Sequence, residues 1–66
     1  MVISDFTEIE LEYFRVNCNF KDLERKLFES RAKGKSLLEI ATELHISIDY
    51  ARKISQKVNK KIIKVI

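Results

Sequence analysis

The 66-residue chain contains a single glycine, Gly34, and no proline. Folds built from short strands need frequent tight turns, and tight turns depend on glycine, proline or Asn-Gly pairs. Their scarcity predicts an all-α protein whose helices are joined by short connections. A chain this short buries only about 60% of the surface that its unfolded state exposes. We therefore expect one compact four-helix domain over residues 1–66.

The first predicted helix covers residues 7–16. Thr7 and Glu10 have the spacing of a capping box, in which each side chain bonds the backbone N–H of the other residue. Apolar residues and glutamates alternate over 9–13, which is also a strand signal. The capping box favours the helix, because a first turn is also where the helix dipole favours acidic residues. Apolar residues recur on one face of this helix at Ile9, Tyr13 and Val16.

The second helix is predicted over residues 21–33 and the third over 37–44. Gly34 follows the second helix, at the position where left-handed backbone often ends a helix. Ser36 and Glu39 form another predicted capping box at the start of the third.

The last helix is predicted over residues 48–64, with Ser47 as its N-cap. A length of 17 residues corresponds to about 25 Å. Its apolar residues recur on one face at Ala51, Ile54, Val58 and Ile62.

Residues 34–54 carry a recognisable set of positions: Gly34-Lys35-Ser36, Glu39-Ile40-Ala41, Leu44 and Ile46-Ser47. This set resembles the helix-turn-helix of LuxR-type regulators and of sigma-factor region 4. The resemblance covers about residues 20–64, with 1–19 as an additional N-terminal helix, and it implies a DNA-binding domain. His45 stands where that group usually has glycine. Positive φ at this position would be tolerated less well by histidine than by glycine. Ala51 is smaller than the aliphatic residue usual there.

Charge is distributed unevenly along the chain. Residues 1–14 contain four acidic and no basic residues, whereas residues 50–66 contain six basic and no acidic ones. A basic segment of this kind is typical of proteins that bind polyanions, although it is also found on ordinary solvated helices. With the apolar stripe of the last helix facing inward, its outer face must hold Asp49, Arg52, Lys53, Gln56, Lys57 and Lys60.

This outer face predicts double-stranded DNA as the partner, with the last helix in the major groove. Arg52, Lys53 and Gln56 are the expected base contacts, because Arg pairs well with guanine and Gln with adenine. Asp49 is a further candidate, or else an acid that compensates the helix dipole. The expected phosphate contacts are Lys35, Ser36, Ser47, Tyr50, Lys57, Lys60 and Lys61.

Other classes of function have little support in the sequence. Cys18 and His45 are the only cysteine and histidine, and they do not form a metal-ligand set. No paired acid and base, nucleophile motif or phosphate loop is present, so we expect no enzyme, cofactor or small-molecule substrate. No apolar run approaches the roughly 18 residues of a membrane span. A single cysteine and no leader sequence suggest a cytoplasmic protein.

Both ends of the chain are apolar. Met1, Val2, Ile3 and Phe6 lie at one end, and Ile62, Ile63, Val65 and Ile66 lie at the other. These ends either pack together in one monomer or form the seam of a homodimer, in which the acidic segment 5–12 would face the basic last helix of a partner.

The alternative to a DNA-binding regulator is a protein-interaction module that uses the apolar ends. Such a module would be antitoxin-like, or an adaptor that contacts RNA polymerase.

Overall fold

The computed structural model describes residues 2–66, which form an all-α domain without strands. A short 3-10 helix, Ile3–Asp5, precedes the four α-helices α1 (Glu8–Asn17), α2 (Asp22–Ala32), α3 (Leu37–Leu44) and α4 (Ile48–Val65). The predicted all-α, four-helix fold is therefore confirmed, and the helix boundaries differ from the predicted ones by one residue at most. Met1, which we grouped with the apolar N-terminal residues, lies outside the described residues.

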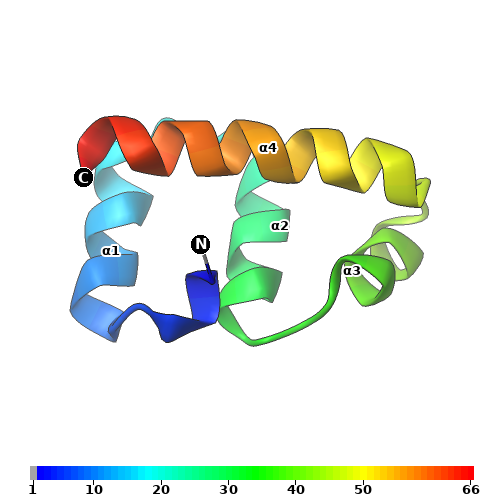
Figure 1. Cartoon of the computed structure of the whole chain (residues 1–66), viewed down its shortest axis with the longest axis horizontal. Helices are drawn as coiled ribbons and strands as arrows, with labels where there is room; N and C mark the ends of the chain where they lie inside the picture. Colours follow the sequence, from blue (N-terminus) through cyan, green and yellow to red (C-terminus); the bar gives the residue numbers. More distant parts are fainter. Residues whose placement is uncertain (1) are drawn as a thin grey trace.

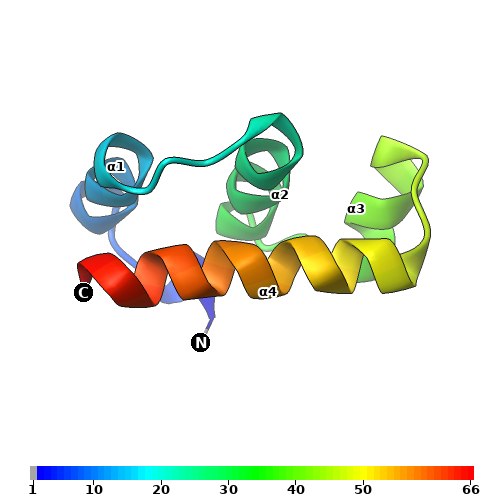
Figure 2. The ribbon, with the colours of Figure 1, turned by 90° about the horizontal axis from the view of Figure 1, so that it is seen from above.

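Helix α4 runs along the whole length of the molecule, whose principal extents are 29 × 18 × 18 Å. The three shorter helices lie side by side against it (Figure 1). Helix α1 packs near its C-terminal end, α2 near its middle and α3 near its N-terminal end. The view from above gives the same order (Figure 2). The long helix is thus the element on which the other three are assembled.

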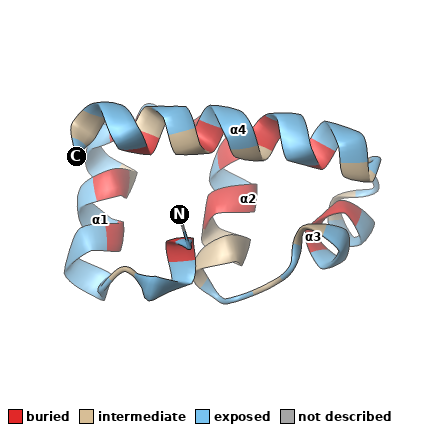
Figure 3. Ribbon diagram, viewed as in Figure 1, coloured by how far each residue is buried: buried red, intermediate tan, exposed pale blue. Residues whose placement is uncertain are grey.

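The core lies between the inner face of α4 and the three shorter helices (Figure 3). The predicted apolar stripe of α4 is buried at all four of its positions. Leu27 and Phe28 of α2 and Ile40 of α3 are completely inaccessible to solvent. The ring of Phe28 has Phe20 on one side, at a centroid distance of 4.8 Å, and Phe14 on another, at 6.4 Å. Aromatic rings from successive segments therefore hold α1 and α2 together.

Both predicted capping boxes are present. The Thr7 hydroxyl accepts the N–H of Glu10, whose carboxylate accepts the N–H of Thr7 at 2.8 Å. Ser36 and Glu39 are paired in the same way, with both distances at 3.2 Å. Each box satisfies backbone donors that have no partner within the helix. The starts of α1 and α3 are thus determined locally by the sequence.

Helices α2 and α3 end in the same type of turn. After α2, Gly34 has φ +88° and donates to the carbonyl of Arg31. After α3, His45 has φ 56° and ψ 43°, and it donates to the carbonyl of Thr42. In both turns the next residue bonds the carbonyl one position further back, which is the Schellman pattern. His45 therefore occupies a left-handed position that glycine adopts at lower cost.

Helix α1 turns its predicted apolar face, Ile9, Tyr13 and Val16, outward. Those three residues are exposed, while Leu11 and Phe14 are buried instead. The rotation of α1 about its axis is determined by two contacts. Phe14 packs edge-on against Phe6, and Arg15 forms a two-bond ion pair with Glu29 of α2. The result is an apolar stripe on α1 that this chain leaves uncovered.

Candidate nucleic-acid interface

The outer face of α4 carries all four expected base contacts. Asp49, Arg52, Lys53 and Gln56 are exposed and project from its N-terminal half. Arg52 Nη1 lies 3.2 Å from Asp49 Oδ1. With 63% and 82% of the two side chains exposed, this pair is in full contact with solvent and contributes little to stability. The guanidinium is therefore available to exchange Asp49 for another acceptor.

A ridge of lysines extends from these residues toward the C-terminal end of α4. Lys53, Lys57, Lys60 and Lys64 are spaced i, i+4, i+7 and i+11, which places them on one side of the helix. All four are exposed, and none forms a salt bridge within the described residues 2–66. The ridge is about 16 Å long, at 1.5 Å per residue. Its charges are uncompensated by the protein itself, so a polyanion would relieve their mutual repulsion.

Lys61, one of the expected phosphate contacts, forms hydrogen bonds within the protein. Its ammonium group donates to the backbone carbonyl of Asn19 at 2.7 Å and to the carboxylate of Glu24. The Glu24 side chain is only 8% exposed, and it also accepts the N–H of Lys21. Lys61 thus joins α4 to the start of α2, and it is not free for a ligand. Its hydrogen bond holds the pKa of Glu24 below the usual glutamate value.

Lys21 is a candidate that the sequence reasoning missed. A hollow of about 350 Å³ lies between the start of α2 and α4, and its lining residues are Lys21, Glu24, Lys57, Lys60, Lys61 and Lys64. The only carboxylate among them, Glu24, is already engaged by Lys61. Lys21 therefore adds a fifth ammonium group to four lysines of α4. In sequence it is 36 residues from Lys57 (57 − 21), and only the packing of α2 on α4 brings them together.

Tyr50 lies beside this basic hollow. It is about half exposed and lines a second depression together with Leu23 and Lys57. The amide N–H of Tyr50 donates to the hydroxyl oxygen of Ser47, the N-cap of α4, at 3.1 Å, so the first turn of α4 is well defined. A phenol at this place, next to an unpaired lysine, is suited to donate to a phosphate oxygen.

The remaining expected phosphate contacts lie apart from the lysine ridge. Lys35 Nζ is 2.7 Å from the carboxylate of Glu43, and Ser36 caps α3. Neither residue lines the two depressions beside α2. The hydroxyl groups of Ser36 and Ser47 accept backbone N–H bonds, which leaves their own protons available for donation.

Two other chemically distinctive side chains lie outside this surface. Cys18 is buried, with Sγ 3.5 Å from the carbonyl oxygen of Lys61, and burial raises the pKa of its thiol. His45 is exposed at the turn before α4. Over residues 2–66, no group of three or more potential metal-ligating side chains is assembled. No helix in the same range is both long and apolar enough to cross a membrane.

The candidate surface is thus the basic face of α4, extended by Lys21 at the start of α2. Comparisons of the chain with protein-family models, with curated proteins and with solved structures gave no match.

Proposed function

We propose that this protein binds double-stranded DNA, with α3, the turn at 45–47 and α4 acting as a helix-turn-helix. The observation that carries the proposal is the outer face of α4. This face has one acidic residue, Asp49, at its start and only basic or neutral residues after it. The helix is held from behind by its buried stripe, so its polar face is presented as a rigid surface. Such a surface is what a recognition helix needs.

In this proposal the N-terminal half of α4 enters the major groove. Arg52 leaves Asp49 to form two hydrogen bonds with a guanine, and Gln56 pairs in the same way with an adenine. Lys53 contacts a neighbouring base. Asp49 either accepts from a cytosine amino group or remains near Arg52 and orients it. A base-specific contact with good two-bond geometry contributes about 1–3 kcal/mol of discrimination.

Phosphate contacts would position the helix in the groove. Lys57, Lys60 and Lys21 line one hollow, and Tyr50 lines the neighbouring depression together with Lys21 and Lys57. Lys35, Ser36 and Ser47 would contact a second stretch of backbone from the first turns of α3 and α4, where the helix dipole attracts anions. Lys61 is omitted from this set because its ammonium group is bonded to Glu24 and Asn19.

The test is the salt dependence of binding to a random-sequence duplex, measured by fluorescence anisotropy. The four lysines of this set predict a slope of log K against log salt of about −3.6, since each phosphate neutralised by a lysine contributes about −0.9. A variant with Ala at 52, 53 and 56 should lose sequence preference, as measured by selection from a random pool. Wild-type affinity of this triple variant for every duplex would contradict the proposed recognition helix.

A second candidate is a protein-interaction module, for example an adaptor that contacts RNA polymerase. The exposed apolar stripe of α1 favours it, because a helix face of this kind usually has a protein partner. The two functions are separated by the same titration. Absence of DNA binding at low salt, where electrostatic contacts are strongest, would leave only the interaction module.

A further inference from the structure

Exposed large apolar side chains are concentrated at one end of the molecule. Five of the eight in residues 2–66 lie on α1 or at the end of α4, which Figure 1 shows next to each other. These five are Ile9, Tyr13, Val16, Ile63 and Ile66. The expected base contacts lie toward the opposite end, on the first half of α4. The long helix therefore separates an apolar surface from a polar one.

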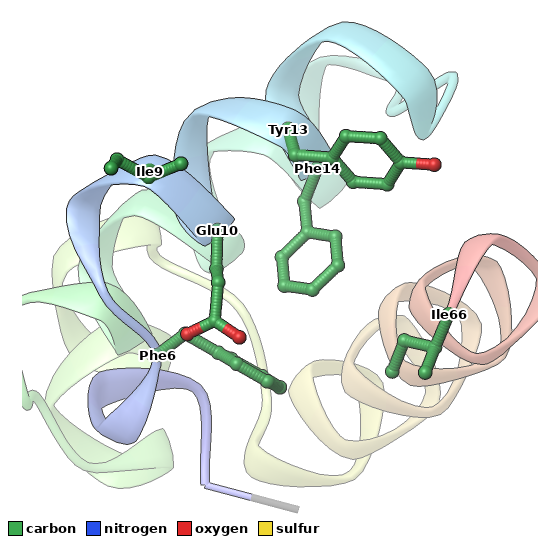
Figure 4. A pocket seen from close by; sticks show the side chains of 6 residues that line it. All are labelled: Phe6, Ile9, Glu10, Tyr13, Phe14 and Ile66. Carbon is green, nitrogen blue, oxygen red and sulfur yellow. The ribbon is translucent and has the colours of Figure 1, made fainter.

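The apolar end also contains a cleft. It has a volume of about 310 Å³ and lies between α1 and the end of α4 (Figure 4), lined by Phe6, Ile9, Glu10, Tyr13, Phe14 and Ile66. The Tyr13 hydroxyl lies 3.4 Å from the carbonyl oxygen of Val65 and joins the two helices across it. The carboxylate of Glu10 already accepts the N–H of Thr7. The cleft thus presents mainly hydrocarbon to an occupant, and it favours an apolar one.

The charged residues around the apolar surface of α1 and the end of α4 indicate which kind of partner would cover it. Glu8 and Glu12 flank the exposed stripe of α1, and both share the single guanidinium of Arg15 with Glu29. The α1 side is therefore acidic around an apolar centre. At the end of α4, Ile63 is flanked by Lys60 and Lys64, so that side is basic around an apolar centre.

Two α1 helices packed face to face would oppose their glutamates, which is unfavourable. One α1 packed on the end of another α4 places acid against base. Because every copy carries both surfaces, the contact is self-complementary, as a two-fold symmetric dimer requires.

We propose that a second copy of this chain covers this end, with α1 of each protomer packed on the last turns of α4 of the other. The inference deepens the proposed function, since Lys53 and Ile63 lie about 15 Å apart along α4. With the two α4 helices end to end and the two-fold axis near Ile63, the two recognition segments would be separated by roughly 30 Å. Half-sites one turn apart are separated by about 34 Å. A standard interface of about 800 Å² per partner would occupy about a sixth of the 4572 Å² surface.

The experiment is sedimentation equilibrium of the full chain from micromolar to millimolar concentration. The mass is expected to rise from the 7.8 kDa of one chain toward twice that value. Ile9→Lys should weaken the dimer at least tenfold, because it removes an apolar contact and places a positive charge opposite the lysines at the end of the partner's α4, while leaving the circular dichroism spectrum unchanged. Leu38→Lys is the matched control, since Leu38 is also exposed but lies on α3.

Charge exchange tests the pairing itself. Glu12→Lys and Lys64→Glu should each weaken the dimer, and their combination should restore it, with thermal melting to verify the fold of each variant. A constant mass of 7.8 kDa, an equal effect of Leu38→Lys, or no restoration in the double variant would overturn the proposal. Dimerisation without any DNA binding would leave this inference standing and reject the proposed function.

Discussion

Lys61 and Glu24 form an ion pair that joins the C-terminal half of α4 to the first turn of α2. The carboxylate is almost fully buried, and it accepts hydrogen bonds from both the Lys61 ammonium group and the N–H of Lys21. Lys61 also bonds the carbonyl of Asn19 in the connection between α1 and α2. One side chain thus connects three segments, and its loss would affect the packing of each.

The first prediction concerns stability in acid. Hydrogen bonds from Lys61 and Arg15 hold the pKa values of Glu24 and Glu29, respectively, below the ordinary value of 4.5. A carboxyl with a lowered pKa in the folded state stabilises the fold above its unfolded-state pKa, and this contribution disappears as the pH falls through the folded-state pKa. The free energy of unfolding should therefore be nearly constant from pH 7 to 5 and decline below about pH 4.5.

Glu24→Gln is the variant that isolates one of these groups. It keeps the shape of the side chain but removes its charge, and it should reduce the free energy of unfolding at pH 7 by about 1–3 kcal/mol. Its decline in acid should be shallower than that of the wild type. Urea unfolding at several pH values measures both. Parallel pH profiles for the two proteins would contradict the role assigned to Glu24.

The second prediction concerns the turn before α4. His45 adopts left-handed backbone, which costs a residue with a β-carbon about 1–2 kcal/mol relative to the right-handed region. Glycine removes that cost and adds about 0.5–1 kcal/mol of unfolded-state entropy. His45→Gly should therefore leave stability unchanged or raise it by up to about 1.5 kcal/mol. His45→Val should lower stability, because branching at the β-carbon raises the energy of left-handed backbone. Thermal unfolding would show His45→Val melting at a lower temperature than His45→Gly, and equal melting temperatures would refute the argument.

The third prediction concerns Lys21, which the hollow brings next to Lys57 and Lys60. If Lys21 contacts a phosphate, Lys21→Ala should weaken binding to all duplexes alike and reduce the magnitude of the salt slope by about 0.9. Lys26→Ala is the control on the same helix, because Lys26 is exposed but lines neither basic depression. An identical change in both variants would mean that only net charge matters.

The fourth prediction separates base contacts from backbone contacts on α4. Arg52→Ala should weaken binding to the selected sequence by about 1–3 kcal/mol and relax the preference at one base position. Lys60→Ala should weaken binding to selected and random duplexes equally. Competition titrations with both duplexes measure the difference. If Arg52→Ala retained full discrimination, the first half of α4 would not be the specificity element.

Local features of the sequence were sufficient for most of the fold. The serine and threonine caps, Gly34 and the buried stripe of α4 depend on residues within a few positions of each other, so their patterns are visible along the chain. The exposure of Arg52 and Gln56 follows from that stripe, because residues on the face of a helix opposite its buried stripe point toward solvent. Left-handed backbone at His45 was considered only because helix-turn-helix proteins usually have glycine at this position, and it was not predicted.

The missed features depend on contacts between distant segments. Lys61 and Lys60 are adjacent in sequence and look equally suited to bind phosphate, yet only Lys61 faces Glu24. Lys21 joins the basic face solely because α2 begins beside α4. The sequence likewise did not predict that the apolar face of α1 points outward, since its apolar spacing is typical of a buried helix face. Its orientation results from the contacts of Phe14 and Arg15 with other segments.

The continuity of α4 has a mechanical consequence. One uninterrupted helix of 18 residues connects the polar surface to the apolar end, so neither can move independently of the other. Inserting one residue between Gln56 and Ile62 would lengthen the connection by about 1.5 Å and rotate one end against the other by about 100°. The number of residues in this helix therefore determines both the separation and the relative angle of the two surfaces.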